Sequence, residues 1–422
     1  MSFWLVGSLL LGIAVVLAVA NLWLRRDEIQ REIEPLYGVE DQRFVHTISV
    51  LLGPPLTGGH SVKALLNGDE IFPAMLEAIG SARRTITFET FIYWEGSIGK
   101  KFADAIIDRA RAGVRCHLVL DWVGANRMNQ EWLKQMKDAG AEVCYYRPLR
   151  WWNLTRMNNR THRKLLVIDG KVGFTGGVGI ADEWLGQAQD PEHWRDSHFR
   201  IEGPAVAQMQ AAFMDNWVQT NAVLLHGEDY FPLLESRGDT LAQMFTSAPE
   251  NGTENARLMY LLSIASAQRS IRIASAYFVP DELSISTLCD AKTKRGVDVK
   301  ILVPGSHIDT HVTRRASRSL WEPLLECGIE IYEFQPTMFH VKIMIVDGIW
   351  VSVGSTNFDN RSFKLNDEAN LNIWDRNFAE QQTAVFDADL ERAKRVTLED
   401  WRNRPLREKA IEQAAKLVRW QL

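Results

Sequence analysis

A short pattern, His-x-Lys-x-x-x-x-Asp, occurs twice in this chain, once in each half. The chain has ten histidines, and average residue frequencies would give about 0.04 such matches by chance. The repeated pattern therefore constrains the fold strongly, because two similar units must each present one copy. Its residues are His162, Lys164 and Asp169 in the first half and His340, Lys342 and Asp347 in the second.

The segments around the two copies alternate between helix and strand in the same order. Amphipathic spacing predicts helices over 72–82, 99–112, 257–267 and 283–294. Runs of β-branched and aromatic residues predict strands over 84–93, 114–120, 270–278 and 297–303. This alternation predicts an α/β fold with a mostly parallel sheet and helices on its faces. We expect two homologous domains facing each other, over 60–226 and 250–395, a boundary within 227–255 and a helical tail over 396–422.

The spacing within each copy suits an anionic ligand. On a strand, residues two apart share a face, so His162 and Lys164 point the same way, as do the corresponding residues of the second copy. A histidine and a lysine in one cleft favour a phosphate group. Small residues follow each copy, Gly177 in the first and Ser355 in the second, and would let the backbone approach a phosphate closely. Asn357 can add a neutral hydrogen bond.

Metal and cofactor sites are poorly supported by the sequence. A charged lysine cannot ligate a metal, and no His, Cys or Asp cluster has ligand spacing. The glycines within 176–179 lack the spacing of a nucleotide-binding loop. We therefore predict a site without a metal or cofactor.

The paired patterns resemble the phospholipase D superfamily, and within it the bacterial cardiolipin synthases of the phospholipase D type. The likeness extends over about 60–395. Besides the two copies, the segments that carry it are 159–164, 277–280, 296–299, 357–363 and 365–368. The resemblance implies two αβα sandwich domains related by a pseudo-twofold axis, with the active site at their interface.

The resemblance also implies a two-step displacement without a metal. One histidine attacks phosphorus and forms a phosphohistidine, and the other protonates the leaving alcohol and then activates the incoming one. The superfamily's commoner assignment makes His162 the nucleophile. The lysines would stabilise charge on the phosphoryl oxygens. Asp169 and Asp347 belong to the pattern but are expected to support it structurally rather than to carry protons.

An acidic residue should orient each histidine, as in a catalytic triad. By resemblance, Glu368 fills this position after the second copy, and Asp196 is its counterpart after the first. The second copy is followed by Gly-Ser-x-Asn and the first by Gly-Gly-Val-Gly. The two halves are therefore expected to be unequal, with nucleophile and acid/base divided between them.

Residues 3–24 are almost wholly apolar and are followed by Arg25 and Arg26. A helix over this stretch would be about 33 Å long, enough to cross a hydrocarbon core of about 30 Å. We predict a single-pass anchor over 1–26 in the cell inner membrane, with the catalytic body on the cytoplasmic side, because the arginines favour that side. A cleaved signal peptide is the alternative.

Two further segments could meet a membrane. Aromatic residues and arginines alternate over 145–156, and an amphipathic helix is predicted over 404–422. Both could equally pack on the protein body. The four cysteines form no Cys-x-x-Cys pair, so we expect four reduced thiols in the core.

The sequence thus predicts a phosphatidyltransferase that acts on phospholipids at a membrane. Phosphatidylglycerol is the expected donor and acceptor, with glycerol released, and phosphatidylethanolamine is a further candidate substrate. A phospholipase D-type hydrolase or a nuclease of the same superfamily is the first alternative, and a non-catalytic membrane scaffold is the second. The net charge of -5 argues against a nucleic-acid partner. The sequence does not predict an oligomeric state.

Overall fold

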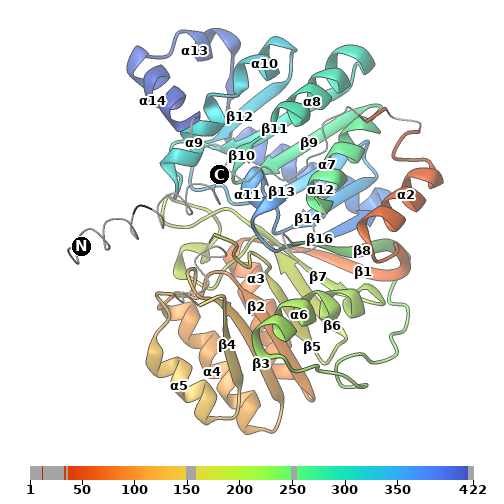
Figure 1. Cartoon of the computed structure of the whole chain (residues 1–422), viewed down its shortest axis with the longest axis vertical. Coiled ribbons are helices and arrows are strands. Elements are labelled where there is room, and N and C mark those ends of the chain that lie inside the picture. The colour runs from red at the N-terminus through yellow and green to blue at the C-terminus, as the bar shows by residue number, and fades with distance from the viewer. Residues whose placement is uncertain (1–11, 13–32, 35–36, 149–157, 249–253, 417–422) are drawn as a thin grey trace, which may run out of the picture.

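The computed structural model describes residues 12, 33–34, 37–148, 158–248 and 254–416. Within them, fifteen strands form one continuous mixed sheet, with helices on both faces (Figure 1). The predicted α/β class is confirmed.

The expectation of a mostly parallel sheet was wrong, because ten of its fourteen strand pairings are antiparallel and four are parallel. Short turns, and not crossover helices, join β5 (Leu165–Ile168) to β6 (Val172–Gly176) and β13 (Lys342–Val346) to β14 (Trp350–Gly354), and such turns make antiparallel pairs. Two further short strands, β10 (Phe278–Val279) and β15 (Phe358–Asp359), pair in parallel outside this sheet.

The first half of the chain supplies one side of the sheet. Its helices are α2 (Gln42–Leu52), α3 (Asn67–Ser81), α4 (Ser97–Arg111), α5 (Gln130–Asp138) and α6 (Ala205–Asn221), with a 3-10 helix, η2, at Asp182–Trp184. Its strands are β1 (Thr57–Leu66), β2 (Thr85–Thr90), β3 (Arg115–Asp121), β4 (Glu142–Tyr146), β5 (Leu165–Ile168), β6 (Val172–Gly176) and β7 (Ser197–Glu202).

The second half supplies the other side. Its helices are α7 (Asn255–Ala265), α8 (Glu282–Arg295), α9 (His311–Arg318), α10 (Trp321–Glu326), α11 (Asn360–Lys364), α12 (Arg376–Glu391), α13 (Leu398–Arg402) and α14 (Leu406–Lys416). Its remaining strands are β8 (Thr240–Ser247), β9 (Ser270–Ser275), β11 (Asp298–Pro304), β12 (Glu330–Phe334), β13 (Lys342–Val346), β14 (Trp350–Gly354), β16 (Glu368–Trp374) and β17 (Ala393–Val396).

The strand order of one half repeats in the other. From the centre outwards, the first half runs β1-β7-β6-β5-β2-β3-β4 and the second runs β8-β16-β14-β13-β9-β11-β12. The halves join edge to edge where β1 pairs antiparallel with β8. The second half carries one strand more, because β17 pairs with the outer edge of β12. The predicted boundary segment 227–255 is therefore no simple linker, since it contains β8.

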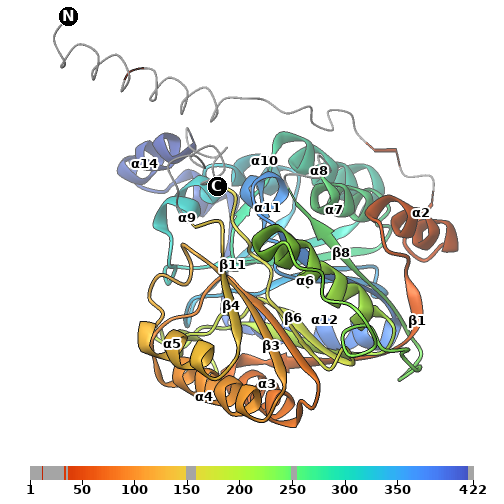
Figure 2. The ribbon, with the colours of Figure 1, turned by 60° about the horizontal axis from the view of Figure 1, so that its bottom comes forward.

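Helices form layers on both faces of the sheet. Figure 2 shows α3, α4 and α5 below the first half of the sheet and α6 above it. One apolar cluster lies under α3–α5, another under α2, α7, α8 and α10, and a central cluster includes side chains of both α6 and α12. The central cluster holds the two halves together, for example through Phe199 and Phe378, whose ring centroids are 6.1 Å apart.

The cysteines differ from the prediction of four thiols. Cys289 on α8 and Cys327 after α10 form a disulfide, with their Cα atoms 5.7 Å apart. The prediction was wrong for this pair because the two residues are 38 positions apart and come together only when α8 packs against α10. Cys116 and Cys144 are free thiols.

The predicted membrane segments fall into two groups. The predicted anchor at 3–24, apart from residue 12, and residues 149–157 of the aromatic segment lie outside the described residues. Among the residues that are described, no helix has the length and apolar character needed to span a bilayer. The C-terminal helix α14 packs on the body against α9, where Glu412 bonds Arg318 and Arg404 and is buried.

Candidate active site

The two copies of the pattern meet where the halves of the chain touch. His162 lies just before β5, and His340 lies just before β13. The backbone N–H of His162 donates to the carbonyl of Asp367 at 2.8 Å, and that of His340 donates to the carbonyl of Arg195 at 2.7 Å. Each bond crosses from one half to the other. Both histidines are therefore fixed by the opposite half.

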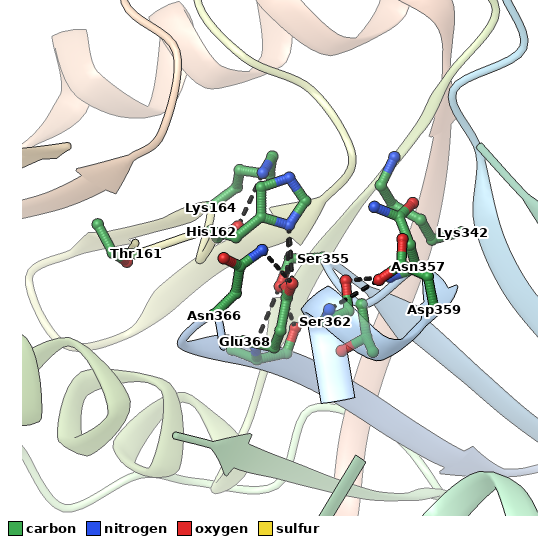
Figure 3. Close-up of polar contacts among 12 residues, drawn as sticks. Thr161, His162, Lys164, Lys342, Ser355, Asn357, Asp359, Ser362, Asn366 and Glu368 are labelled. Carbon is green, nitrogen blue, oxygen red and sulfur yellow. Dashed lines mark hydrogen bonds and ion pairs between the residues drawn. The ribbon is translucent and has the colours of Figure 1, made fainter. Parts of the chain in front are cut away.

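The acidic partners are exchanged in the same way. Nδ1 of His162 lies 3.0 Å from Oε1 of Glu368, and Nδ1 of His340 lies 2.8 Å from Oδ2 of Asp196 (Figure 3 shows the first pair). We expected each acid to serve the copy in its own half. That pairing was wrong, because the parallel bridges Thr161–Asp367 and Arg195–Phe339 place each acid beside the opposite histidine.

The hydrogen bonds fix which nitrogen of each histidine can react. An ionised carboxylate only accepts hydrogen bonds, so Nδ1 of each ring carries the proton and Nε2 keeps its lone pair. Burial lowers the pKa of His162 to about 4, although Glu368 opposes this shift. Burial and the neighbouring Lys342 also lower the pKa of His340. Both rings are therefore neutral in the unliganded site, and His162 can act as a nucleophile.

The two carboxyl groups are ionised despite their burial. Burial alone would raise the pKa of Glu368 and of Asp196. The adjoining histidine in each pair and the nearby lysine charge outweigh this effect and hold both pKa values below the usual value. Two buried acids that stay charged are suited to stabilise an imidazolium during a reaction.

Both lysines are buried beside the histidine rings. Nζ of Lys164 donates to the carbonyl of His162 at 2.7 Å, and Nζ of Lys342 donates to the carbonyl of His340 at 2.6 Å. Burial lowers the pKa of Lys164 to about 7 and that of Lys342 to about 8. An ammonium group that has lost most of its water gains much from an anionic ligand. The lysines are thus placed to bind phosphoryl oxygens.

Gly177 and Ser355 occupy matching positions beside the two acids. The Ser355 hydroxyl donates to Oε2 of Glu368 at 2.5 Å. A Cβ added to Gly177 would lie 2.3 Å from Oδ1 of Asp196, so the missing side chain makes room for this carboxylate. We expected these small residues to let backbone approach a phosphate. In the structure both residues lie against the acids that hold the histidines, while a close approach of the backbone to a phosphate stays a prediction.

Asn357 lies near Lys342 in Figure 3. Its side chain is buried, and its Oδ1 has no hydrogen-bond partner among the described residues. Its backbone N–H donates to the Ser362 hydroxyl at 3.2 Å. The side-chain Oδ1 of Asn357 is therefore a buried acceptor without a hydrogen-bond partner among the described residues.

Asp169 and Asp347 lie away from this group, at the far ends of β5 and β13. At about 3.3 Å per residue, the strand separates Asp169 from Lys164 by roughly 16 Å. Each carboxylate accepts three backbone N–H groups where a helix turns into the next strand; for Asp347 the donors are Gln268, Arg269 and Ser270. The structure thus separates these two aspartates from the histidines and lysines of the pattern.

Several residues around the histidines were not predicted. The ring of Phe91 packs edge-on against His162, and those of Trp184 and Trp194 pack against His340. Trp184 also donates from Nε1 to Asp196 at 2.9 Å. The chain has 15 tryptophans, but nothing in the sequence indicates which of them meets which histidine.

The first half also has a buried polar network near His162, which no spacing in the sequence predicts. Asn216 and Thr161 donate to Glu89, and Arg163 is fully buried nearby. Burial raises the pKa of Glu89 to about 7. Within the described residues, no three His, Cys, Asp or Glu side chains come together as metal ligands. The predicted lack of a metal or cofactor stays a prediction.

Comparison with known proteins identifies the family. A family model described as "Cardiolipin synthase, PLD-like domain" matches twice, over 75–217 and 260–390. Cardiolipin synthase 1 of Bacillus cereus is 33% identical over 401 residues, which cover 92% of this chain and 78% of that protein. Cardiolipin synthase of Geobacillus sp. (strain WCH70) is 36% identical over 395 residues, with the same two coverages.

One solved structure supports the fold. Phosphatidylserine synthase of Haemophilus influenzae Rd KW20 superposes with a TM-score of 0.69, covering 90% of this chain and 100% of that one, at 15% sequence identity. At that identity the likeness concerns the fold alone. Together with the sequence relatives, these matches confirm the resemblance read from the paired patterns. The chain belongs to the phospholipase D superfamily and, within it, to the cardiolipin synthase-like phosphatidyltransferases.

Proposed function

We propose that this enzyme transfers a phosphatidyl group from one phosphatidylglycerol to the hydroxyl of a second, forming cardiolipin and releasing glycerol. The observation that carries the proposal is the pair of buried histidines, each held through Nδ1 by an acid, with a lysine beside each ring. The related cardiolipin synthases support the choice of substrates. Phosphatidylethanolamine is a second candidate donor.

In the first step, Nε2 of His162 attacks phosphorus while the bond from phosphorus to the glycerol oxygen breaks. The departing oxygen needs a proton, and His340 supplies it from Nε2. His340 is neutral without a ligand, but the negative charge of the bound phosphodiester raises its pKa and lets it take up that proton. Asp196 stabilises the resulting imidazolium, while Lys164 and Lys342 bind the phosphoryl oxygens.

In the second step, the hydroxyl of the acceptor lipid attacks the phosphohistidine. His340 removes the hydroxyl proton as the new oxygen–phosphorus bond forms and the nitrogen–phosphorus bond breaks. The choice of His162 as nucleophile follows the resemblance. Asn357, Ser355 and Gly177 are proposed to support these groups, and Asp169 and Asp347 to support the pattern from a distance. No cofactor takes part in this scheme.

The test is mass spectrometry of the lipids formed from phosphatidylglycerol vesicles. Cardiolipin and free glycerol should appear in equal amounts, and His162→Asn should reduce both by roughly 10³-fold or more. Phosphatidic acid without cardiolipin would replace the proposal by the hydrolase alternative, and cleavage of single-stranded DNA would favour the nuclease. Labelled phosphate trapped on His340 instead of His162 would reverse the two histidine roles.

We further propose that the halves are homologous domains, over 60–226 and 250–395, related by a pseudo-twofold axis.

We also propose that residues 3–24 anchor the protein in the inner membrane. The catalytic body then lies on the cytoplasmic side, because Arg25 and Arg26 favour that side. The Cys289–Cys327 disulfide argues for the opposite side, because disulfides persist in oxidising compartments. Green fluorescent protein fused to the C-terminus fluoresces only in the cytoplasm, so a dark fusion would overturn the proposed side.

A further inference from the structure

Arg195, the residue immediately before the acid Asp196, is buried and forms an ion pair that crosses from one half to the other. It is 3% exposed, and its partner Asp389, in the last turn of α12, is 7% exposed. Nε of Arg195 donates to Oδ1 of Asp389 at 2.9 Å, and Nη2 donates to Oδ2 at 2.8 Å. A guanidinium that donates in parallel to both carboxylate oxygens is held in one orientation.

The position of Asp389 is unfavourable for α12 itself. The carbonyl groups at the C-terminal end of a helix repel a negative charge, and the last turn of α12 carries no basic residue. A buried carboxylate also needs a partner, because its transfer out of water is costly. Arg195 is that partner, so a contact between the two halves stabilises the charge of Asp389.

The same guanidinium also holds the backbone at the acid. Nη1 of Arg195 donates to the carbonyl of Asp196 at 2.5 Å and to the Ser197 hydroxyl at 3.0 Å. The backbone N–H of Arg195 donates to the carbonyl of Met338 at 2.9 Å, and its carbonyl accepts from His340. Arg195 therefore joins α12, Asp196 and the segment that leads into His340. A lysine could not replace it, because an ammonium group lacks the planar fork of donors.

The other histidine is held by different side chains. Asp367 directly precedes the second acid, as Arg195 precedes the first, and its carbonyl accepts from the backbone N–H of His162. The side chain of Asp367 accepts a hydrogen bond from the hydroxyl of Tyr146 on β4. The two matching positions thus carry opposite charges. The ion pair of Arg195 therefore belongs to the side of the site that holds His340.

We propose that Arg195 and Asp389 are positioning residues for the proton transfer by His340. Their ion pair holds the backbone of Asp196, and with it the carboxylate that lies 2.8 Å from Nδ1 of His340. The orientation of the imidazole decides whether its Nε2 can reach the oxygen of the leaving glycerol. A displacement of about 1 Å at such a contact can cost roughly 100-fold in rate. The inference rests on the proposed function, in which His340 protonates that oxygen.

The test compares two leaving groups with the full-length enzyme. Phosphatidylglycerol releases a glycerol oxygen that needs a proton, whereas the nitrophenyl ester of phosphatidic acid releases nitrophenolate, which needs none. Asp389→Asn keeps the size of the side chain and removes its charge. We expect kcat on phosphatidylglycerol vesicles to fall by about 10–100-fold with KM within about twofold, and nitrophenolate release in the first turnover to slow by less than about threefold.

Three comparison variants are measured in the same way, and circular dichroism checks that each is folded. Asp387→Asn removes an exposed carboxylate from the same helix and should change neither rate. Glu368→Gln disturbs His162 and should slow both substrates, because His162 attacks phosphorus in either case. Arg195→Lys keeps the charge but loses the fork, so it should show the same selective loss as Asp389→Asn, and it tests the same contact if that variant does not fold.

Equal losses on the two substrates in Asp389→Asn and Arg195→Lys, with Glu368→Gln still slowing both, would overturn the proposal, because a general distortion of the site does not depend on the leaving group. A folded Asp389→Asn with unchanged kcat would also overturn it.

Failure of the proposed function gives different patterns. Phosphatidic acid formed in place of cardiolipin would contradict the transfer reaction, while a selective loss in Asp389→Asn would still support the positioning role. Exchanged histidine roles would make Glu368→Gln the selective variant and Asp389→Asn the one that slows both substrates, which would overturn the assignment of the ion pair to proton transfer.

Discussion

The negative charges of Glu368 and Asp196, which face the two histidines, can be tested by substitution. Glu368→Gln and Asp196→Asn keep the size of each side chain but remove the charge that stabilises an imidazolium. We expect kcat to fall by about 10²–10⁴-fold in each variant, with a small change in KM, because the acids act through the histidines. Steady-state assays on phosphatidylglycerol vesicles measure both constants.

Glu235→Gln is the matched control for these variants. Glu235 is exposed and far along the chain from either histidine, so its substitution should leave kcat unchanged. A second measurement tests which acid contacts which histidine. Glu368→Gln should alter the titration of His162, and Asp196→Asn that of His340, when the rings are followed by nuclear magnetic resonance. The reverse pattern would contradict the pairing across the halves.

Gly177 supports a second prediction at the residue scale. In Gly177→Ala the new methyl group would collide with Asp196 and displace its carboxylate from His340. We expect kcat to fall by at least about 100-fold while the protein stays folded. Gly80→Ala is a matched control on α3, where an added Cβ meets nothing within 4 Å. Full activity of Gly177→Ala would show that Asp196 does not need this space.

At the scale of the element, Asp347 tests whether the third residue of the pattern is structural. Asp347→Asn keeps a residue that tolerates its left-handed φ of 52° but weakens the acceptor of three backbone N–H groups. We expect the free energy of unfolding to fall by about 1–3 kcal/mol. Urea denaturation measures this change, and the kcat of the folded variant should stay within about twofold of wild type.

Asp104→Asn is the comparison variant, because Asp104 is exposed on α4 and its loss should change stability little. A catalytic role for Asp347 would give the opposite result, with a large loss of kcat and unchanged stability.

Sequence periodicity predicted the elements around the patterns closely. The strands expected over 114–120 and 297–303 correspond to β3 and β11, and the helix expected over 283–294 corresponds to α8. α8 also has clear end signals, since Asp281 caps its first turn and Gly296 ends it with a φ of 71°. The local sequence was sufficient to predict an element wherever its hydrophobic periodicity and its end signals agree.

The strands that join the halves could not be predicted in the same way. β1 and β8 pair with each other across a long stretch of chain, and β8 lies in a segment whose polar composition resembles a linker. The exchange of Glu368 and Asp196 between the histidines has the same origin. The sequence identified all four residues, but which acid meets which histidine depends on contacts between the halves, and spacing along the chain carries no information about these.

At the scale of the whole molecule, the buried lysines predict opposite effects of pH on activity and stability. Lys164 must be charged to bind phosphate, and its pKa is about 7, while that of Lys342 is about 8. We therefore expect kcat/KM to decline as pH rises through about 7–8. Since the pKa of His162 is about 4, no acidic decline from this residue is expected above about pH 5.

Stability should change in the other direction. In the unfolded chain these lysines titrate near 10.5, so between pH 7 and 10.5 the unfolded state binds more protons than the folded state. The free energy of unfolding should then rise with pH over this window. Lys164→Arg should move the decline in kcat/KM towards the pKa of Lys342, because arginine stays charged. A kcat/KM that is flat to pH 9 in the wild type would contradict the lysine assignment.

The exchanged histidine–acid pairs also bear on how such a gene can change over generations. His162 depends on Glu368, and His340 depends on Asp196, so deletion of either half breaks both pairs at once. A substitution that displaces one acid therefore disturbs the histidine encoded in the other half. The two copies are therefore inherited as one unit of selection, and neither can drift towards a new activity while its twin preserves the old one.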